Sequence, residues 1–147
     1  MNDPFTVAPP VAAGADALSL LASAHRHIDR LFAEYEAAGA DAPVERRREF
    51  ALAVCRELTI HATIEEQLFY PALRKAGAHQ SLLERAHEEH VEACALVTEI
   101  QAAIAEGRNA DWKVRQLIHS VRTHLPEEET ELFAAARQCG VDLRRAR

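Results

Sequence analysis

Histidine and glutamate recur at one spacing in two separate stretches of this sequence. His61 is followed four residues later by Glu65, and His124 is followed four residues later by Glu128. In an α-helix such a pair lies about one turn apart on the same face. Imidazole nitrogen and carboxylate oxygen suit iron or manganese, so the two pairs could hold metal if the fold brought them together.

Two single histidines precede these pairs at similar distances in the sequence. His25 precedes His61 by 36 residues, and His90 precedes His124 by 34. Each of the four histidines falls on the same helical face as neighbouring leucines and valines. We therefore expect four histidines and two glutamates to point into one apolar interior.

An internal repeat contains both pairs. Aligned without gaps, residues 61–77 and 124–140 coincide at His, two adjacent Glu, Ala, Arg and Gly. The repeat therefore predicts two similar helical hairpins. Two related hairpins would place two equivalent ligand sets about a pseudo-twofold axis.

The elements that carry these residues are predicted to be helical. Alanine supplies 29 of the 147 residues, and long stretches lack glycine and proline. Glycines 39, 77 and 107 are natural helix ends. The expected helices cover residues 16–39, 43–76, 80–106 and 111–139, with Asp16 as a possible N-cap.

Four helices with short connections bury their apolar faces most simply as an all-α, up-down-up-down antiparallel four-helix bundle. We expect this bundle over residues 15–140. The proline-rich residues 1–14 are predicted to form an extended arm, and residues 141–147 a short basic tail. Pro71 and Pro126 lie inside expected helices, so we expect Pro71 to kink its helix or end it early and Pro126 to kink or restart its own.

Burial of the two glutamates is the strongest argument for metal. A single inward histidine is usually hydrogen-bonded to a neighbour, and a His/Glu pair on a helix surface is usually a solvated ion pair. Two carboxylates in an apolar interior, however, each cost several kcal/mol unless they are paired or bind metal. Metal binding explains all six residues at once.

The same residues resemble the hemerythrin-like (HHE cation-binding) family, whose pattern is His, His-x-x-x-Glu, His, His-x-x-x-Glu. The resemblance covers residues 16–139. It rests on four local strings: AHRHIDRLF around His25, HATIEEQLFYPAL from His61, EEHVEACALV around His90 and HLPEEETELF from His124.

The resemblance implies a non-haem di-iron centre inside a four-helix bundle. It makes His25, His61, His90 and His124 terminal ligands and Glu65 and Glu128 bridges. The two irons would share an oxo or hydroxo bridge and keep about one open position each.

Helix 80–106 departs from the oxygen-carrying members of that family. Those carriers resemble His-x-x-x-His there, whereas this chain has Ala86 four residues before His90. His87 is one candidate to fill the vacancy. The remaining polar residues near these faces are interpreted as solvated or packing residues: Glu66, Glu127, Glu129, Tyr35, Tyr70 and Cys94.

Composition excludes several classes of function. The net charge is −6 and the basic residues are scattered, so we expect no nucleic-acid or membrane partner. No apolar run reaches the roughly 18–20 residues that span a bilayer, and no basic segment precedes Arg26, as a signal peptide would require. Three widely spaced cysteines fit reduced thiols, so we expect a cytoplasmic protein.

The resulting functional hypothesis is a di-iron protein that binds or reacts with dioxygen, peroxide or nitric oxide. Two alternatives stay open: a stress-response enzyme that decomposes peroxide or nitric oxide, and an iron storage or sensing protein that acts through a partner. The sequence identifies neither the electron donor nor a protein partner.

Overall fold

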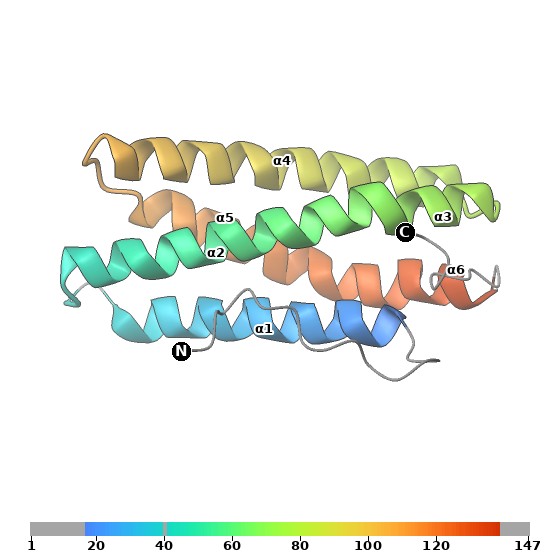
Figure 1. Cartoon of the computed structure of the whole chain (residues 1–147), viewed down its shortest axis with the longest axis horizontal. Helices are drawn as coiled ribbons and strands as arrows, with labels where there is room; N and C mark the ends of the chain where they lie inside the picture. The colour runs from blue at the N-terminus through green and yellow to red at the C-terminus, as the bar shows by residue number, and fades with distance from the viewer. Residues whose placement is uncertain (1–16, 40, 139–147) are drawn as a thin grey trace.

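The computed structural model describes residues 17–39 and 41–138, and helix is the one kind of regular structure within them (Figure 1). The elements are α1 (Ala17–Ala38), α2 (Val44–Ile64), η1 (Glu65–Phe69), α3 (Tyr70–Lys75), α4 (Gln80–Ala105), α5 (Asp111–Glu127), η2 (Glu128–Leu132) and α6 (Phe133–Gln138). The expected all-α class is confirmed. The expected arm, the basic tail and the N-cap at Asp16 lie outside the described residues.

These elements form four rods that lie side by side along the long axis of the molecule (Figure 1). The first rod is α1 and the third is α4. The second consists of α2, η1 and α3 in continuous succession, and the fourth consists of α5, η2 and α6. Helix α1 packs on α2 and α5, and α4 packs on the same two helices. This arrangement is that of a helical bundle.

Glycine ends the second and third rods, as the sequence predicts. Gly77 and Gly107 have φ of 86° and 72°, in the region that glycine adopts without steric cost. At both sites two backbone N–H groups bond back into the last turn, from Gly77 to Arg74 and from Ala78 to Leu73 in the first case. These turns reverse the chain sharply and fix the start of the next rod.

Two π-helical segments interrupt the second and fourth rods, and the sequence analysis did not anticipate them. η1 begins at Glu65 and η2 at Glu128, at equivalent places in the internal repeat. In each, a backbone N–H bonds to the carbonyl five residues earlier, Tyr70 to Glu65 and Phe133 to Glu128. π-Bulges of this kind are frequent at functional sites.

Neither of the two prolines ends its rod. Pro71 lies in the first turn of α3, directly after η1, and the rod continues to Lys75. Pro126 lies inside α5, and the rod neither ends nor restarts there. The residue equivalent to Pro126 in the first repeat is Thr63, yet both repeats contain the π segment, so a proline at this position is not required for it.

The apolar core is divided into two clusters. One contains Ile28, Leu58, Val97 and Val121, and the other contains Leu21, Ala86, Phe69 and Leu132. The four histidines of interest fall between these residues along their own helices, so a polar layer separates the two clusters. No helix within the described part of the chain is long and apolar enough to cross a membrane.

Candidate metal centre

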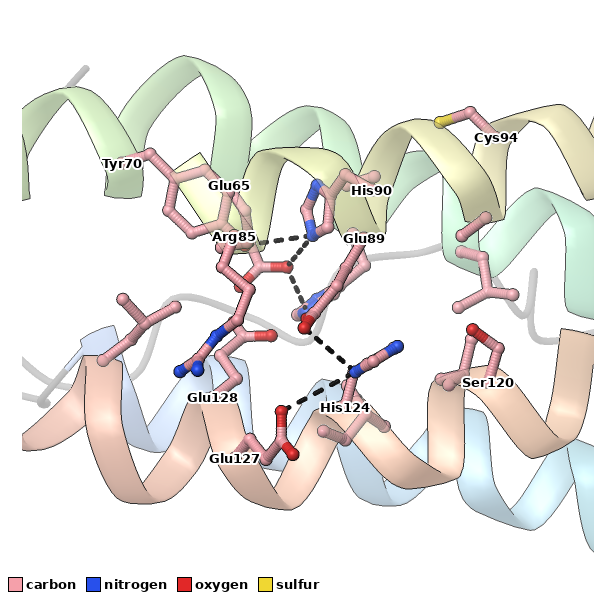
Figure 2. Close-up of a pocket in the computed structure, with 18 of the residues that line it drawn as sticks. Glu65, Tyr70, Arg85, Glu89, His90, Cys94, Ser120, His124, Glu127 and Glu128 are labelled. Carbon is pink, nitrogen blue, oxygen red and sulfur yellow. Dashed lines mark hydrogen bonds and ion pairs between the residues drawn. The ribbon is translucent and has the colours of Figure 1, made fainter. Parts of the chain in front are cut away.

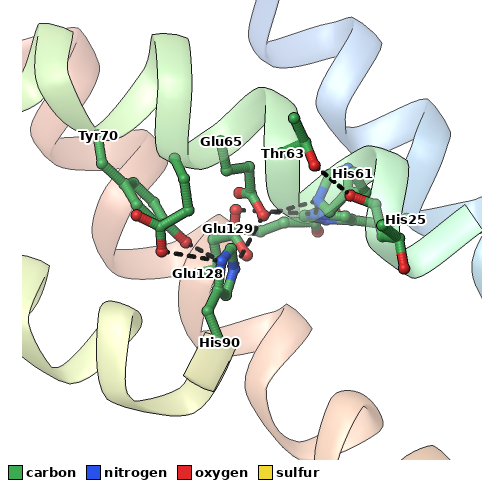
Figure 3. A network of polar contacts seen from close by, with 10 residues as sticks. His25, His61, Thr63, Glu65, Tyr70, His90, Glu128 and Glu129 are labelled. Atoms are coloured by element: carbon green, nitrogen blue, oxygen red, sulfur yellow. Dashed lines mark hydrogen bonds and ion pairs between the residues drawn. The ribbon is translucent and has the colours of Figure 1, made fainter. Parts of the chain in front are cut away.

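Four of the six predicted ligands meet in the interior. Donor atoms of His25, His61, Glu65 and Glu128 all lie within 4.8 Å of one another (Figure 3). The Nε2 atoms of His25 and His61 are 2.8 Å apart. Glu65 Oε1 lies 2.9 Å from His61 Nε2, and Glu128 Oε1 lies 3.8 Å from His25 Nε2. We call these four residues the inner group.

Glu65 is the most deeply buried member of the inner group, with an exposed fraction of 0%. Burial alone would raise the pKa of this carboxyl. The close nitrogens of His61 and His90 outweigh that effect and lower the pKa to about 2, so Glu65 is ionised. A fully buried carboxylate surrounded by imidazoles favours the binding of a cation.

His90 joins the inner group through Glu65. Its Nε2 lies 3.2 Å from Glu65 Oε1, so the fifth predicted ligand reaches the site. The hydroxyl of Tyr70 lies 3.0 Å from the same Nε2. Burial raises the pKa of Tyr70, which keeps the phenol protonated beside His90.

Tyr70 was interpreted as a packing residue, and the structure shows that it also contacts a candidate ligand. In a regular α-helix, five residues turn the chain about 140° away from Glu65. The π-helical hydrogen bond instead places Tyr70 one turn above Glu65. The sequence carried no signal for that segment, so the residue was missed.

His124, the sixth predicted ligand, does not join the inner group. Its Nδ1 lies 3.1 Å from Glu89 Oε1 and 3.7 Å from Glu127 Oε2 (Figure 2). These three residues also offer donor atoms within 4.8 Å of one another. We call Glu89, His124 and Glu127 the outer group. Glu89 was not singled out from the sequence, and Glu127 was interpreted there as a solvated residue.

Two other glutamates interpreted as solvated contact candidate ligands. Glu129 Oε1 lies 3.0 Å from His25 Nδ1, and Glu66 Oε1 lies 3.3 Å from His90 Nδ1. Because the Nδ1–H of His25 donates to Glu129, its Nε2 presents a lone pair to the interior. Glu66 and Glu129 are equivalent in the repeat, and each contacts a histidine of the other hairpin. Their coincidence in the repeat was the available signal.

His87 does not fill the position that a fifth histidine would occupy. Its side chain is 61% exposed, and its Nδ1 lies 3.1 Å from Glu66 Oε1. Ala86 is buried in the apolar cluster below the site. Cys94 is exposed and belongs to neither donor group.

A cavity of about 70 Å³ adjoins both groups. Carboxylates and imidazoles line one part of it, and apolar side chains from three rods line the rest: Leu58, Ala62, Ala86, Ala93, Val97 and Val121. Arg85 pairs with Glu131 at its edge. This volume has room for a few water-sized molecules and excludes a bulky substrate.

The arrangement of the donor atoms suits metal binding better than it suits hydrogen bonds between them. Both oxygens of Glu65, Oε1 of Glu128, and Nδ1 of His90 and His124 are buried without a hydrogen-bond partner. The short distances from Glu65 to His61 and His90, and from Glu128 to His25, are therefore close contacts without hydrogen-bond geometry. Unsatisfied buried polar atoms cost free energy unless an ion or water completes them.

Comparison with known proteins agrees with this chemistry. The family model described as the hemerythrin HHE cation-binding domain matches residues 16–136. A protein of Nostoc sp. (strain PCC 7120) named DNA nickase is 30% identical over 116 residues, which cover 77% of this chain. The chain spans less than a third, 31%, of that relative's length, and no solved structure gives a significant match. The match over most of its length shows that the chain belongs to the hemerythrin HHE cation-binding family.

Proposed function

We propose that this protein holds two iron ions in its polar layer and reacts there with dioxygen or a small relative such as peroxide or nitric oxide. The observation that carries the proposal is Glu65, a fully buried carboxylate whose neighbours are imidazoles rather than hydrogen-bond donors from backbone. Its burial is stable only if positive charge compensates it. A cation-binding family supports the same conclusion.

The chemistry of the donors favours iron or manganese. Imidazole and carboxylate suit these ions, and thiolates play no part in either donor group. The proposed terminal ligands are the four histidines and the proposed bridges are the two repeat-related glutamates: His25, His61, His90, His124, Glu65 and Glu128. Iron bound in this way supplies electrons and Lewis acidity to a small oxidant.

Residues around the proposed site orient a ligand and limit which molecules can enter. Glu129 holds the ring of His25 with its Nε2 toward the interior. The cavity admits a molecule of a few atoms, and its apolar lining limits the entry of water. Tyr70 keeps a proton on its hydroxyl beside His90.

Turnover of peroxide or nitric oxide is a second candidate, and Tyr70 is the observation that favours it. A protonated phenol at the edge of the site is a hydrogen-bond donor and a source of a proton.

The test uses reduced, iron-loaded protein in stopped-flow spectroscopy. Mixing with oxygen, peroxide or nitric oxide should change the optical spectrum for at least one of the three. A stable and reversible response to oxygen supports binding, whereas repeated consumption of peroxide or nitric oxide supports catalysis. If iron-loaded protein responds to none of the three, the proposed function is wrong.

A further inference from the structure

The two halves of the polar layer differ, although the repeat relates them. The inner group presents two imidazoles and two carboxylates and is almost entirely buried. The outer group presents one imidazole and two carboxylates, and His124 is 30% exposed. The difference begins in the sequence.

The outer carboxylates have no counterparts in the first hairpin. Glu127 is equivalent to Ile64 in the repeat, and Glu89, which precedes His90, corresponds to Ala24, which precedes His25. Two acidic residues are thus present in one half only, and both contact the histidine of that half.

The geometry directs these donors at one point. His124 presents Nδ1 to Glu89 and Glu127, and this nitrogen is buried without a hydrogen-bond partner. Figure 2 shows the carboxyl group of Glu128 in the same pocket. Glu128 is 10% exposed, and its Oε1 also lacks a hydrogen-bond partner. An unsatisfied carboxylate thus faces the outer group from the inner one.

We infer that Glu89, His124 and Glu127 form a cation position that differs from the inner one, with Glu89 as a direct ligand. This inference rests on the proposed function and deepens it, because it assigns ligands to the second ion. Two carboxylates on one imidazole favour a hard divalent ion such as Mn²⁺ or Fe²⁺. Because this position is more exposed, its ion should bind more weakly and exchange faster than the inner ion.

The test titrates metal-free protein with Mn²⁺ and follows the free ion by electron paramagnetic resonance. The wild-type chain should bind two ions in two steps of different affinity. Glu89→Gln should keep the tight step and weaken the second by more than the roughly 10–100-fold typical of a residue that only orients a ligand. Glu65→Gln should instead remove the tight step.

The matched control is Glu88→Gln, which changes an exposed glutamate beside Glu89 on α4 and should leave both steps unchanged. Circular dichroism checks that every variant keeps its helices. Two unchanged steps in Glu89→Gln, or a loss within 10–100-fold, would overturn direct ligation by Glu89 while the two-metal proposal stands. A wild-type chain that binds no Mn²⁺ and no iron would overturn the proposed function itself.

Discussion

At the scale of single residues, the ligand histidines depend on carboxylates that do not themselves face the centre. His25 donates from Nδ1 to Glu129, and His90 has Nδ1 next to Glu66. The hydrogen bond to Glu129 fixes the tautomer and the orientation of His25 as an imidazole ligand. The glutamate that follows each proposed bridge thus lies beside a histidine of the opposite hairpin, and Glu129 forms a hydrogen bond there.

Replacing Glu129 by alanine should weaken metal binding without removing a ligand. The loss of the His25 contact frees the ring to rotate and to change tautomer, so affinity should fall about 10–100-fold. Competition with a chelator of known affinity measures the change, and Glu88→Ala is the control. Equal affinities in Glu129→Ala and Glu88→Ala would show that Glu129 is merely a surface residue.

His25 should also make the metal-free protein sensitive to pH. Burial and the neighbouring His61 lower the pKa of His25 below its ordinary 6.5, despite the opposing carboxylates of Glu129 and Glu65. The unfolded chain takes up a proton near pH 6.5, whereas the folded chain resists it. The free energy of unfolding should therefore fall as the pH drops below about 7.

Urea denaturation of metal-free protein between pH 5.5 and 7.5 measures this dependence. His25→Gln removes the titrating group, so its free energy of unfolding should change less over that range. An identical slope in both proteins would mean that His25 titrates normally in the folded state.

At the scale of elements, the π segments decide which residues reach the site. The helical period alone was enough to predict that His61 and Glu65 share a face, because they lie upstream of the interruption or at its first residue. The helical period did not predict the position of Tyr70, which directly follows η1. It also gave no means of placing Glu89, because side-chain contacts between rods depend on how each helix is rotated.

Deleting Gln67 tests the role of η1. Removing one residue leaves Tyr70 four residues after Glu65, which in a regular α-helix is again about one turn along the same face, so Tyr70 and Leu73 should keep their orientation relative to Glu65. Leu73 is fully buried and should stay in the apolar cluster, so thermal stability and metal affinity should both change little. Gln67→Ala keeps the chain length at the same exposed position and should behave like wild type. A deletion variant that melts well below wild type and loses metal affinity would show that the register is not kept and that the extra residue of η1 is required.

At the scale of the whole molecule, metal should hold the two apolar clusters together across the polar layer. The fold class and the meeting of His25, His61, Glu65 and Glu128 could be predicted because composition, glycine stops and helical spacing all agree. The division into inner and outer groups could not, because the repeat makes His61 and His124 look equivalent while their surroundings differ.

Removing the metal should destabilise the bundle. The metal-free interior keeps carboxylates and imidazoles without a compensating cation, and a ligand that binds only the folded state raises its stability. For a chain of this size each kcal/mol corresponds to roughly 2–4 °C, so chelation should lower the melting temperature by several degrees. Melting that is the same before and after verified removal would contradict burial of a metal-dependent set.

Iron content tests the central claim most directly. Protein loaded anaerobically with Fe²⁺, freed of excess iron and analysed for metal and for protein by amino-acid analysis should contain two irons per chain. Two irons follow from two donor groups that adjoin one cavity. A chain that retains one iron or none under these conditions would contradict the account.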